Sequence, residues 1–184
     1  MLPGESPSQP DLPERIAAII IAALQSDKGV HAETVIASAA VMTGEYVLRT
    51  ASIDISGMKS GSPIFSDIVN QILFEAEGQL TVSDVFINAL YAQGIEVGKN
   101  SWPEIPEEHQ VIMDPLQVIA RVRPHIDMLF EHEQIEMLER AYQLASTTAL
   151  LVAQTRHVLN PDIGKSLAME AMLKGAKTVP LETA

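Results

Sequence analysis

The chain contains no cysteine among its 184 residues. This absence excludes disulfide bonds, a thiol nucleophile and a thiolate-bound zinc ion. Aromatic residues make up only 4% of the sequence, whereas hydrophobic residues as a whole make up 47%. The core must therefore be aliphatic and rich in alanine. Such a core favours closely packed helices over a sheet, because strands prefer β-branched and aromatic residues.

Basic residues are also scarce. Asp and Glu number 24 against 12 Lys and Arg, which gives a formal net charge of −12 at pH 7. The densest basic cluster is only Arg121 with Arg123. Because phosphate groups would be repelled by this average surface, we expect the protein to bind neither nucleic acid nor an anionic membrane.

Long hydrophobic runs are missing as well. The longest apolar stretch runs from Ile16 to Leu24, whereas a membrane-spanning helix needs about 20 apolar residues. The first ten residues contain three prolines and no positive charge, unlike a secretory signal. We therefore expect a cytoplasmic protein.

What the sequence does contain is helical periodicity. Between Ile135 and Leu159, apolar or small residues recur at spacings of three and four and form two adjacent stripes, which predicts a helix with an unusually wide apolar face. Residues 31–51 show the same pattern. The fold predicted is all-α: a single-domain bundle of six or seven helices with two largely buried central helices, about 31–51 and 135–159. Gly44 would let a neighbouring backbone approach closely, and we expect the two central helices to pair.

The ends of the domain follow from the same pattern. Residues 1–10 are expected to be a flexible tail, residues 11–175 the helical domain, and residues 176–184 a frayed C-terminal tail. Asp11 followed by Glu14, and Thr81 followed by Asp84, have the spacing of capping boxes that begin helices.

Prolines suggest further boundaries. Ser62-Pro63 is expected to begin a helix that turns Phe65 and Ile68 inward. Asp114-Pro115 begins another helix, which we expect to end near Val122 before Pro124. An unbroken helix from Pro124 to Leu159 would be about 54 Å long, longer than a compact domain of this size, at about 40 Å. We therefore expect a break or kink near Glu131–Gln134, or a helix that projects into a partner.

One group of residues has the composition of a metal site. His125, His132 and Glu136 would share one face of a continuous helix, and imidazole and carboxylate groups suit transition metals. Helical metal sites, however, repeat Glu-x-x-His pairs on two helices, and that repeat is missing here. The structural interpretation is a polar, solvent-facing strip, so no cofactor is expected. His31, followed by Glu33, is interpreted as a helix end because no adjacent base accompanies it.

Leu150 interrupts the polar strip of the 135–159 helix. It is either enclosed by the domain or covered by another subunit. Since most symmetric oligomers are two-fold dimers that bury a self-complementary patch, we expect a homodimer with Leu150 in its interface.

Three functions remain open from the sequence. The first is a non-enzymatic protein-interaction module that self-associates, and the missing catalytic motifs favour it. The second is a small-molecule-binding protein or enzyme with an inter-helix pocket. The third is a metal-dependent helical enzyme that uses the histidine cluster. The pocket of the second function would be lined by Met42, Tyr46, Met137 and Tyr142.

Overall fold

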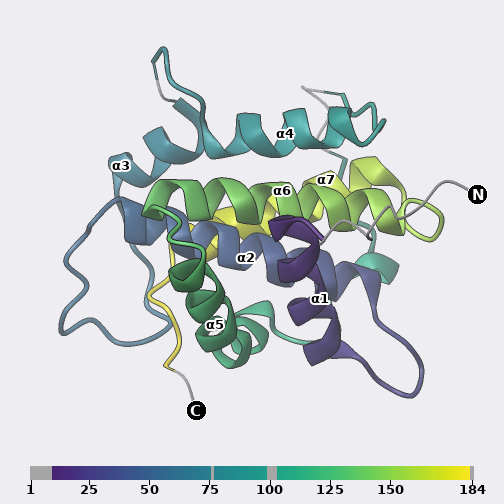
Figure 1. Cartoon of the computed structure of the whole chain (residues 1–184), viewed down its shortest axis with the longest axis horizontal. Helices are drawn as coiled ribbons and strands as arrows, with labels where there is room; N and C mark the ends of the chain where they lie inside the picture. Colours follow the sequence, from purple (N-terminus) through teal and green to yellow (C-terminus); the bar gives the residue numbers. More distant parts are fainter. Residues whose placement is uncertain (1–9, 76, 99–102, 183–184) are drawn as a thin grey trace, which may run out of the picture.

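The seven α-helices of the described chain lie in three tiers (Figure 1). The structure is a computed structural model, and it describes residues 10–75, 77–98 and 103–182. The α-helices are α1 (Leu12–Leu24), α2 (Ala32–Thr50), α3 (Asp67–Asn70), α4 (Val82–Ala92), α5 (Pro115–His132), α6 (Met137–Thr155) and α7 (Pro161–Ala176). Two short helices complete the set: a π-helix, η1 (Gln71–Glu75), directly after α3, and a 3₁₀-helix, η2 (Glu107–His109).

Helix α6 occupies the middle of this arrangement. It packs on α4 on one side and on α2 and α1 on the other, with α7 behind (Figure 1). Its buried residues run from Ala141 to Ala153, whereas Met137, Leu138 and Glu139 at its start are exposed. The all-helical fold predicted from the sequence is confirmed. The helix predicted over about 135–159 spans Met137–Thr155, and its first turn lies at the surface.

Helix α2 is the most enclosed element. Every residue from Glu33 to Leu48 is buried. Its closest neighbour is α7 rather than the expected α6: a Cβ atom on Gly44 would lie 2.0 Å from the carbonyl oxygen of Met172, and one on Gly175 would lie 2.1 Å from that of Val41. The two backbones touch at these glycines, and this contact offsets the cost of about 1 kcal/mol that glycine carries inside a helix.

The chain between α5 and α6 turns sharply. The amide of Ile135 donates to the Phe130 carbonyl and that of Gln134 to the Glu131 carbonyl, while Gln134 has a φ of 56°. This is the Schellman arrangement that closes a helix end. It confirms the predicted break, although no glycine marks it. Pro124 was expected to restart the helix, but it lies inside a continuous α5. Its side chain is exposed to solvent.

The capping boxes at Asp11 and Thr81 are present as predicted, but the helix expected at Ser62-Pro63 is not. Residues 61–64 instead pair with the segment after α7: the Gly61 amide donates to the Val179 carbonyl at 2.9 Å, and the Val179 amide donates back to Ser62 at 2.9 Å. The C-terminal tail was expected to fray from residue 176. Its backbone is instead hydrogen-bonded to residues 61–64 as far as Val179. The helix begins only at Asp67, and Phe65 is 91% exposed rather than buried. Residues 1–9 of the predicted flexible tail lie outside the described residues.

Candidate functional site

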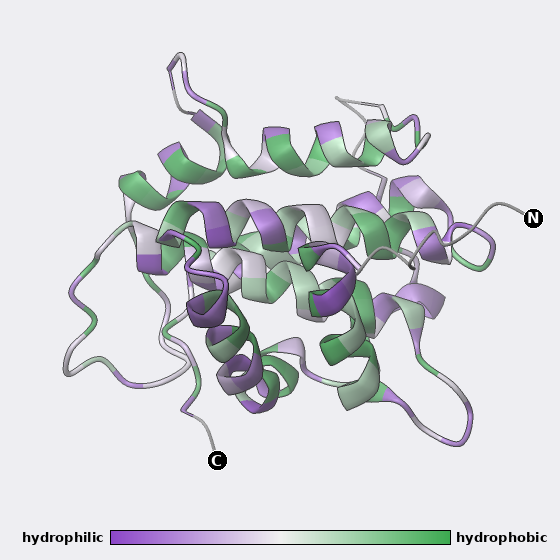
Figure 2. Ribbon diagram, in the orientation of Figure 1, coloured by the Kyte–Doolittle hydropathy of each residue, from purple (hydrophilic) through white to green (hydrophobic). Residues whose placement is uncertain are grey.

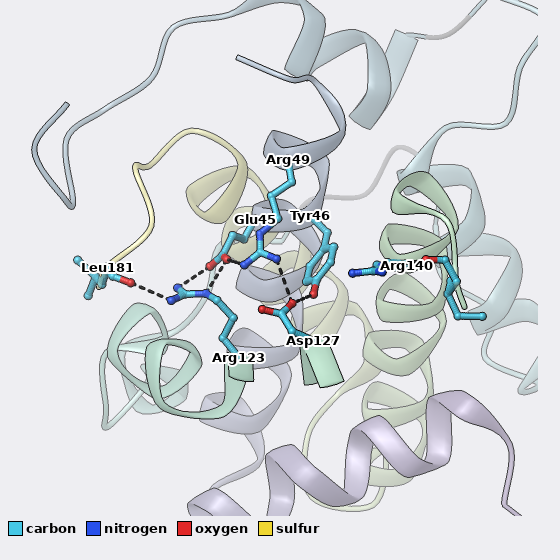
Figure 3. Close-up of polar contacts among 8 residues, drawn as sticks. Glu45, Tyr46, Arg49, Arg123, Asp127, Arg140 and Leu181 are labelled. Carbon is cyan, nitrogen blue, oxygen red and sulfur yellow. Dashed lines mark hydrogen bonds and ion pairs between the residues drawn. The ribbon is translucent and has the colours of Figure 1, made fainter. Parts of the chain in front are cut away.

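A buried polar network joins α2 to α5 (Figure 3). Glu45 is 3% exposed and accepts from Arg123 Nε at 2.6 Å, from Arg123 Nη2 at 2.7 Å and from Arg49 Nη2 at 2.7 Å. Arg49 also donates to Asp127 at 3.0 Å, and the hydroxyl of Tyr46 donates to the same carboxylate. We call Glu45, Tyr46, Arg49, Arg123 and Asp127 the α2–α5 network.

The α2–α5 network is balanced in charge. Two guanidinium groups face two carboxylates, and Arg123 also donates to the Leu181 carbonyl at 2.9 Å. Burial, together with the hydrogen bond to Asp127, raises the pKa of Tyr46 well above its ordinary value, so its hydroxyl remains a donor. Glu45 and Arg123 are buried, Arg49 and Asp127 are partly exposed, and their pairing fixes the position of α5 on α2.

The four residues predicted to line a pocket do not share one location. Met42 and Tyr46 are fully buried, and the Tyr46 ring packs edge-on against Phe130 with centroids 5.4 Å apart. Met137 is 37% exposed. Tyr142 does line a groove, but the α2 residue beside it there is Thr50, one turn beyond Tyr46. Of the four residues predicted to line a pocket, Tyr142 lines this groove, and Met42, Tyr46 and Met137 do not.

This groove has a volume of about 560 Å³ and lies between α3–η1 and the start of α6. The described residues that line it are Thr50, Gln71, Ile72, Glu75, Glu77, Gln79, Leu80, Leu138 and Tyr142. The hydroxyl of Tyr142 donates to the Leu80 carbonyl at 2.8 Å, which ties α6 to the loop that follows η1. One wall contains the π-helix η1, a conformation that often occurs at functional sites.

Large apolar side chains surround the groove without being covered. Ile72, Leu80 and Leu138 line it, and Leu80 is 51% and Leu138 36% exposed. Ile68, one turn before Ile72, is 51% exposed, and Phe65 precedes it. Hydrophobic stretches are visible along α3 and η1 in Figure 2. We call Phe65, Ile68, Ile72, Leu80 and Leu138 the α3–α6 face.

The charged residues at the groove are all acidic. Glu75 and Glu77 are exposed, and neither carboxylate has a hydrogen-bond or ion-pair partner among the described residues. The pKa of Tyr142 is raised by partial burial and by the negative charge of Glu139, which shows the same sign of potential at the groove wall. The groove therefore combines three apolar side chains with a largely polar lining that carries unpaired negative charge.

The residues considered for a metal site are separated by the turn between helices. His125 and His132 lie on α5, whereas Glu136 is the N-cap of α6 beyond the Schellman turn. Among the described residues, no group of three or more histidine, aspartate and glutamate side chains is placed to hold a metal ion. The spacing argument required a continuous helix, and the chain turns there.

Sequence reasoning missed a cluster at the start of α2. Glu33, 8% exposed, lies 2.7 Å from His109 Nδ1 and 3.3 Å from His31 Nε2. Burial opposes ionisation of this carboxyl, but hydrogen bonds and the nearby histidines outweigh it and lower the pKa of Glu33. No spacing in the sequence connects His109 to Glu33, because they meet only in the fold. The contact attaches η2 to α2.

Lys165 and Leu150 both contribute to packing within the described fold. Lys165 is 1% exposed in α7, and its Nζ donates to the Gly98 carbonyl at 2.5 Å, so it anchors the segment after α4. Leu150 is partly buried and packs against the core from α6. Its predicted contact with a second subunit stays a prediction.

No described helix has both the length and the hydrophobicity required to cross a membrane. Comparison of the chain with protein-family models, with curated proteins and with solved structures finds no match.

Proposed function

We propose that the protein is a non-enzymatic helical module that binds other proteins through the α3–α6 face. The observation that carries this proposal is the exposure of large apolar side chains that line one groove, with Leu80 at 51% and Leu138 at 36%. Contiguous exposed apolar surface on a soluble domain is typical of an interaction site. A role within the domain would instead bury these side chains.

The chemistry of the groove supports binding rather than catalysis. The described residues that line it contribute carboxylates, amides, one threonine and one tyrosine to the groove. The Tyr142 hydroxyl is engaged with the Leu80 carbonyl, and the raised pKa of Tyr142 keeps it protonated at neutral pH. A nucleophile with an adjacent general base, which covalent catalysis requires, is not formed by these residues.

A selection of displayed peptides tests this function. Random peptides would be selected on the wild-type protein and then compared on Leu80→Ser/Leu138→Ser, which removes two apolar groups of the groove. The control is Val158→Ser, because Val158 is 75% exposed at the opposite end of α6. We expect enriched peptides to lose binding to the double variant and to keep it with the control. Failure to enrich any peptide, or equal binding to all three proteins, would contradict the function.

Self-association is a second kind of protein binding, and the sequence predicts it at Leu150, outside the α3–α6 face. Sedimentation velocity at concentrations on the order of 100 μM tests it, because a dimer weaker than that has a binding free energy of only about −5.5 kcal/mol. A dimer that dissociates with Leu150→Ser would agree with the prediction. A monomer throughout would remove self-association and leave binding of other proteins open to the peptide selection.

A further inference from the structure

The groove has two kinds of surface that a partner must match. Its apolar part, formed by Ile72, Leu80 and Leu138, calls for aliphatic or aromatic side chains. Its charged part, formed by Glu75 and Glu77, calls for cations, since neither carboxylate is neutralised by a described residue. Exposed, unpaired carboxylates at the edge of an apolar groove raise both the rate and the specificity with which a cationic partner binds.

A second copy of the chain matches the groove poorly. In a two-fold dimer the same surface patch of both subunits meets, so Glu75 and Glu77 of both copies would be gathered in one interface. The formal charge of −12 on each chain adds to this repulsion, and like-charge contacts across an interface are unfavourable. The charge therefore favours a different, basic partner at this face.

The shape of the groove favours a helix as the part that enters. Two of its walls are helical, η1 and the start of α6, and the loop that contains Leu80 forms another. The described residues form only isolated bridges and no strand whose edge could accept an added strand. Binding of an amphipathic helix in a groove uses apolar anchors at spacings of three and four residues. A volume of about 560 Å³ accommodates a few such side chains.

Resting on the proposed function, we propose that the groove binds a short, basic, amphipathic helical segment of a partner protein. Leucine-like side chains of that segment occupy the space beside Ile72, Leu80 and Leu138, and its lysine or arginine side chains pair with Glu75 and Glu77.

Fluorescence anisotropy with designed peptides tests this class of partner. The first probe is a labelled peptide of about 16 residues with Leu at helical spacings of three and four and Lys at the other positions. The second probe has the same leucines and Gln in place of every Lys. We expect the lysine peptide to bind at least about tenfold more tightly, a difference of about 1.4 kcal/mol, and its binding to weaken as salt is raised. Leu138→Ser should weaken it by a similar factor.

A matched pair of variants separates the groove from the general negative charge. Glu75→Gln/Glu77→Gln and Glu107→Gln/Glu108→Gln each neutralise two exposed carboxylates, the first pair at the groove and the second on η2. We expect the first variant to weaken the lysine peptide about tenfold and the second by less than about twofold. Equal losses would show attraction to the whole acidic surface and would overturn the proposal.

The outcomes also separate this inference from the proposed function. If the glutamine peptide binds as tightly as the lysine peptide, and Leu138→Ser weakens both, the groove binds proteins but the basic partner is wrong. If displayed peptides are enriched by the groove but carry no excess of Lys and Arg, the same conclusion follows. If neither designed peptide binds and the selection enriches nothing, both proposals are overturned.

Discussion

The α2–α5 network and the groove beside the α3–α6 face both contain carboxylates, but only those of the network are paired with arginines. Glu45 is 3% exposed and accepts three hydrogen bonds from two arginines. Glu75 and Glu77 are exposed and have no partner among the described residues. The difference lies in the cost of leaving a charge unpaired, which is several kcal/mol in the interior and close to nothing in water.

This difference separates structural from functional polarity in the molecule. A buried charge must be satisfied by the fold itself, so the arginines around Glu45 are accounted for by stability alone. The glutamates of the groove contribute nothing comparable to stability, and they are free to meet a partner. The apolar side chains divide in the same way: Phe86 in α4 is fully buried, and Phe65 is 91% exposed.

The largest effect is expected from breaking the α2–α5 network. Glu45→Ala leaves Arg123 with only the Leu181 carbonyl as a partner and removes one of the two carboxylates that hold Arg49. We expect the free energy of unfolding to fall by about 3–5 kcal/mol, the usual loss when one partner of a buried pair is removed. Urea denaturation followed by circular dichroism measures it.

Arg123→Met provides the comparison for Glu45→Ala. Here Glu45, the buried carboxylate that remains, keeps its bond from Arg49 at 2.7 Å. The loss should therefore be smaller than for Glu45→Ala. A loss below about 1 kcal/mol in Glu45→Ala would mean that the network contributes no more than a surface pair.

The second largest effect concerns the contact of α2 with α7. In Gly44→Ala the new Cβ would lie 2.0 Å from the Met172 carbonyl oxygen, so the two helices must separate. We expect a loss of about 3 kcal/mol, at the upper end for overpacking, because the obstacle is backbone. Gly164→Ala is the control: its Cβ would lie 3.1 Å from Val152 Cγ1, a side-chain atom, and thermal unfolding should show a clearly smaller loss. Equal losses would contradict a backbone contact at Gly44.

The interior could largely be predicted from the sequence. Wide apolar periodicity identified α2 and α6, and the spacing of Asp11 with Glu14 and of Thr81 with Asp84 identified two helix starts. These features are local, so a short stretch of sequence contains their cause. Gly44 indicated that the backbone of another helix would lie close to α2. It could not show that this helix is α7, because any helix can supply a carbonyl.

The α3–α6 face could not be predicted for the opposite reason. Phe65 and Ile68 have the spacing of a buried helix face, and burial was the natural expectation for such residues. Pairing of residues 61–64 with residues 177–179 removes the expected start of that helix, and the sequence contains no trace of this long-range contact. The same holds for Glu33 and His109. Tyr142 lines the groove, whereas Tyr46, predicted beside it, is fully buried and packs against Phe130.

The third prediction uses pH to compare Glu33 with the unpaired glutamates. The folded-state pKa of Glu33 is lowered. The ionised carboxylate therefore stabilises the fold at pH values above the ordinary carboxyl pKa of about 4.3. This stabilisation is lost as pH falls through the lower, folded-state pKa. Glu33→Gln should therefore lower stability at pH 7 by about 1–2 kcal/mol, and the difference from wild type should shrink below about pH 4. Urea denaturation at several pH values measures it. Glu131→Gln, an exposed carboxylate on α5, should show neither effect, and a constant difference for Glu33→Gln would contradict the role of its charge.

The smallest effect on stability is expected at the α3–α6 face, and it is the most informative about function. Phe65→Ala removes a side chain that is 91% exposed, whereas Phe86→Ala removes one that is fully buried. We expect the first to change the free energy of unfolding by less than about 0.5 kcal/mol and the second to lower it by about 3–5 kcal/mol. The same denaturation experiment measures both. A loss above about 1 kcal/mol in Phe65→Ala would mean that the fold itself uses this side chain. With little loss, burial within the domain does not account for Phe65, and contact with a partner remains the physical reason for an aromatic ring at that position.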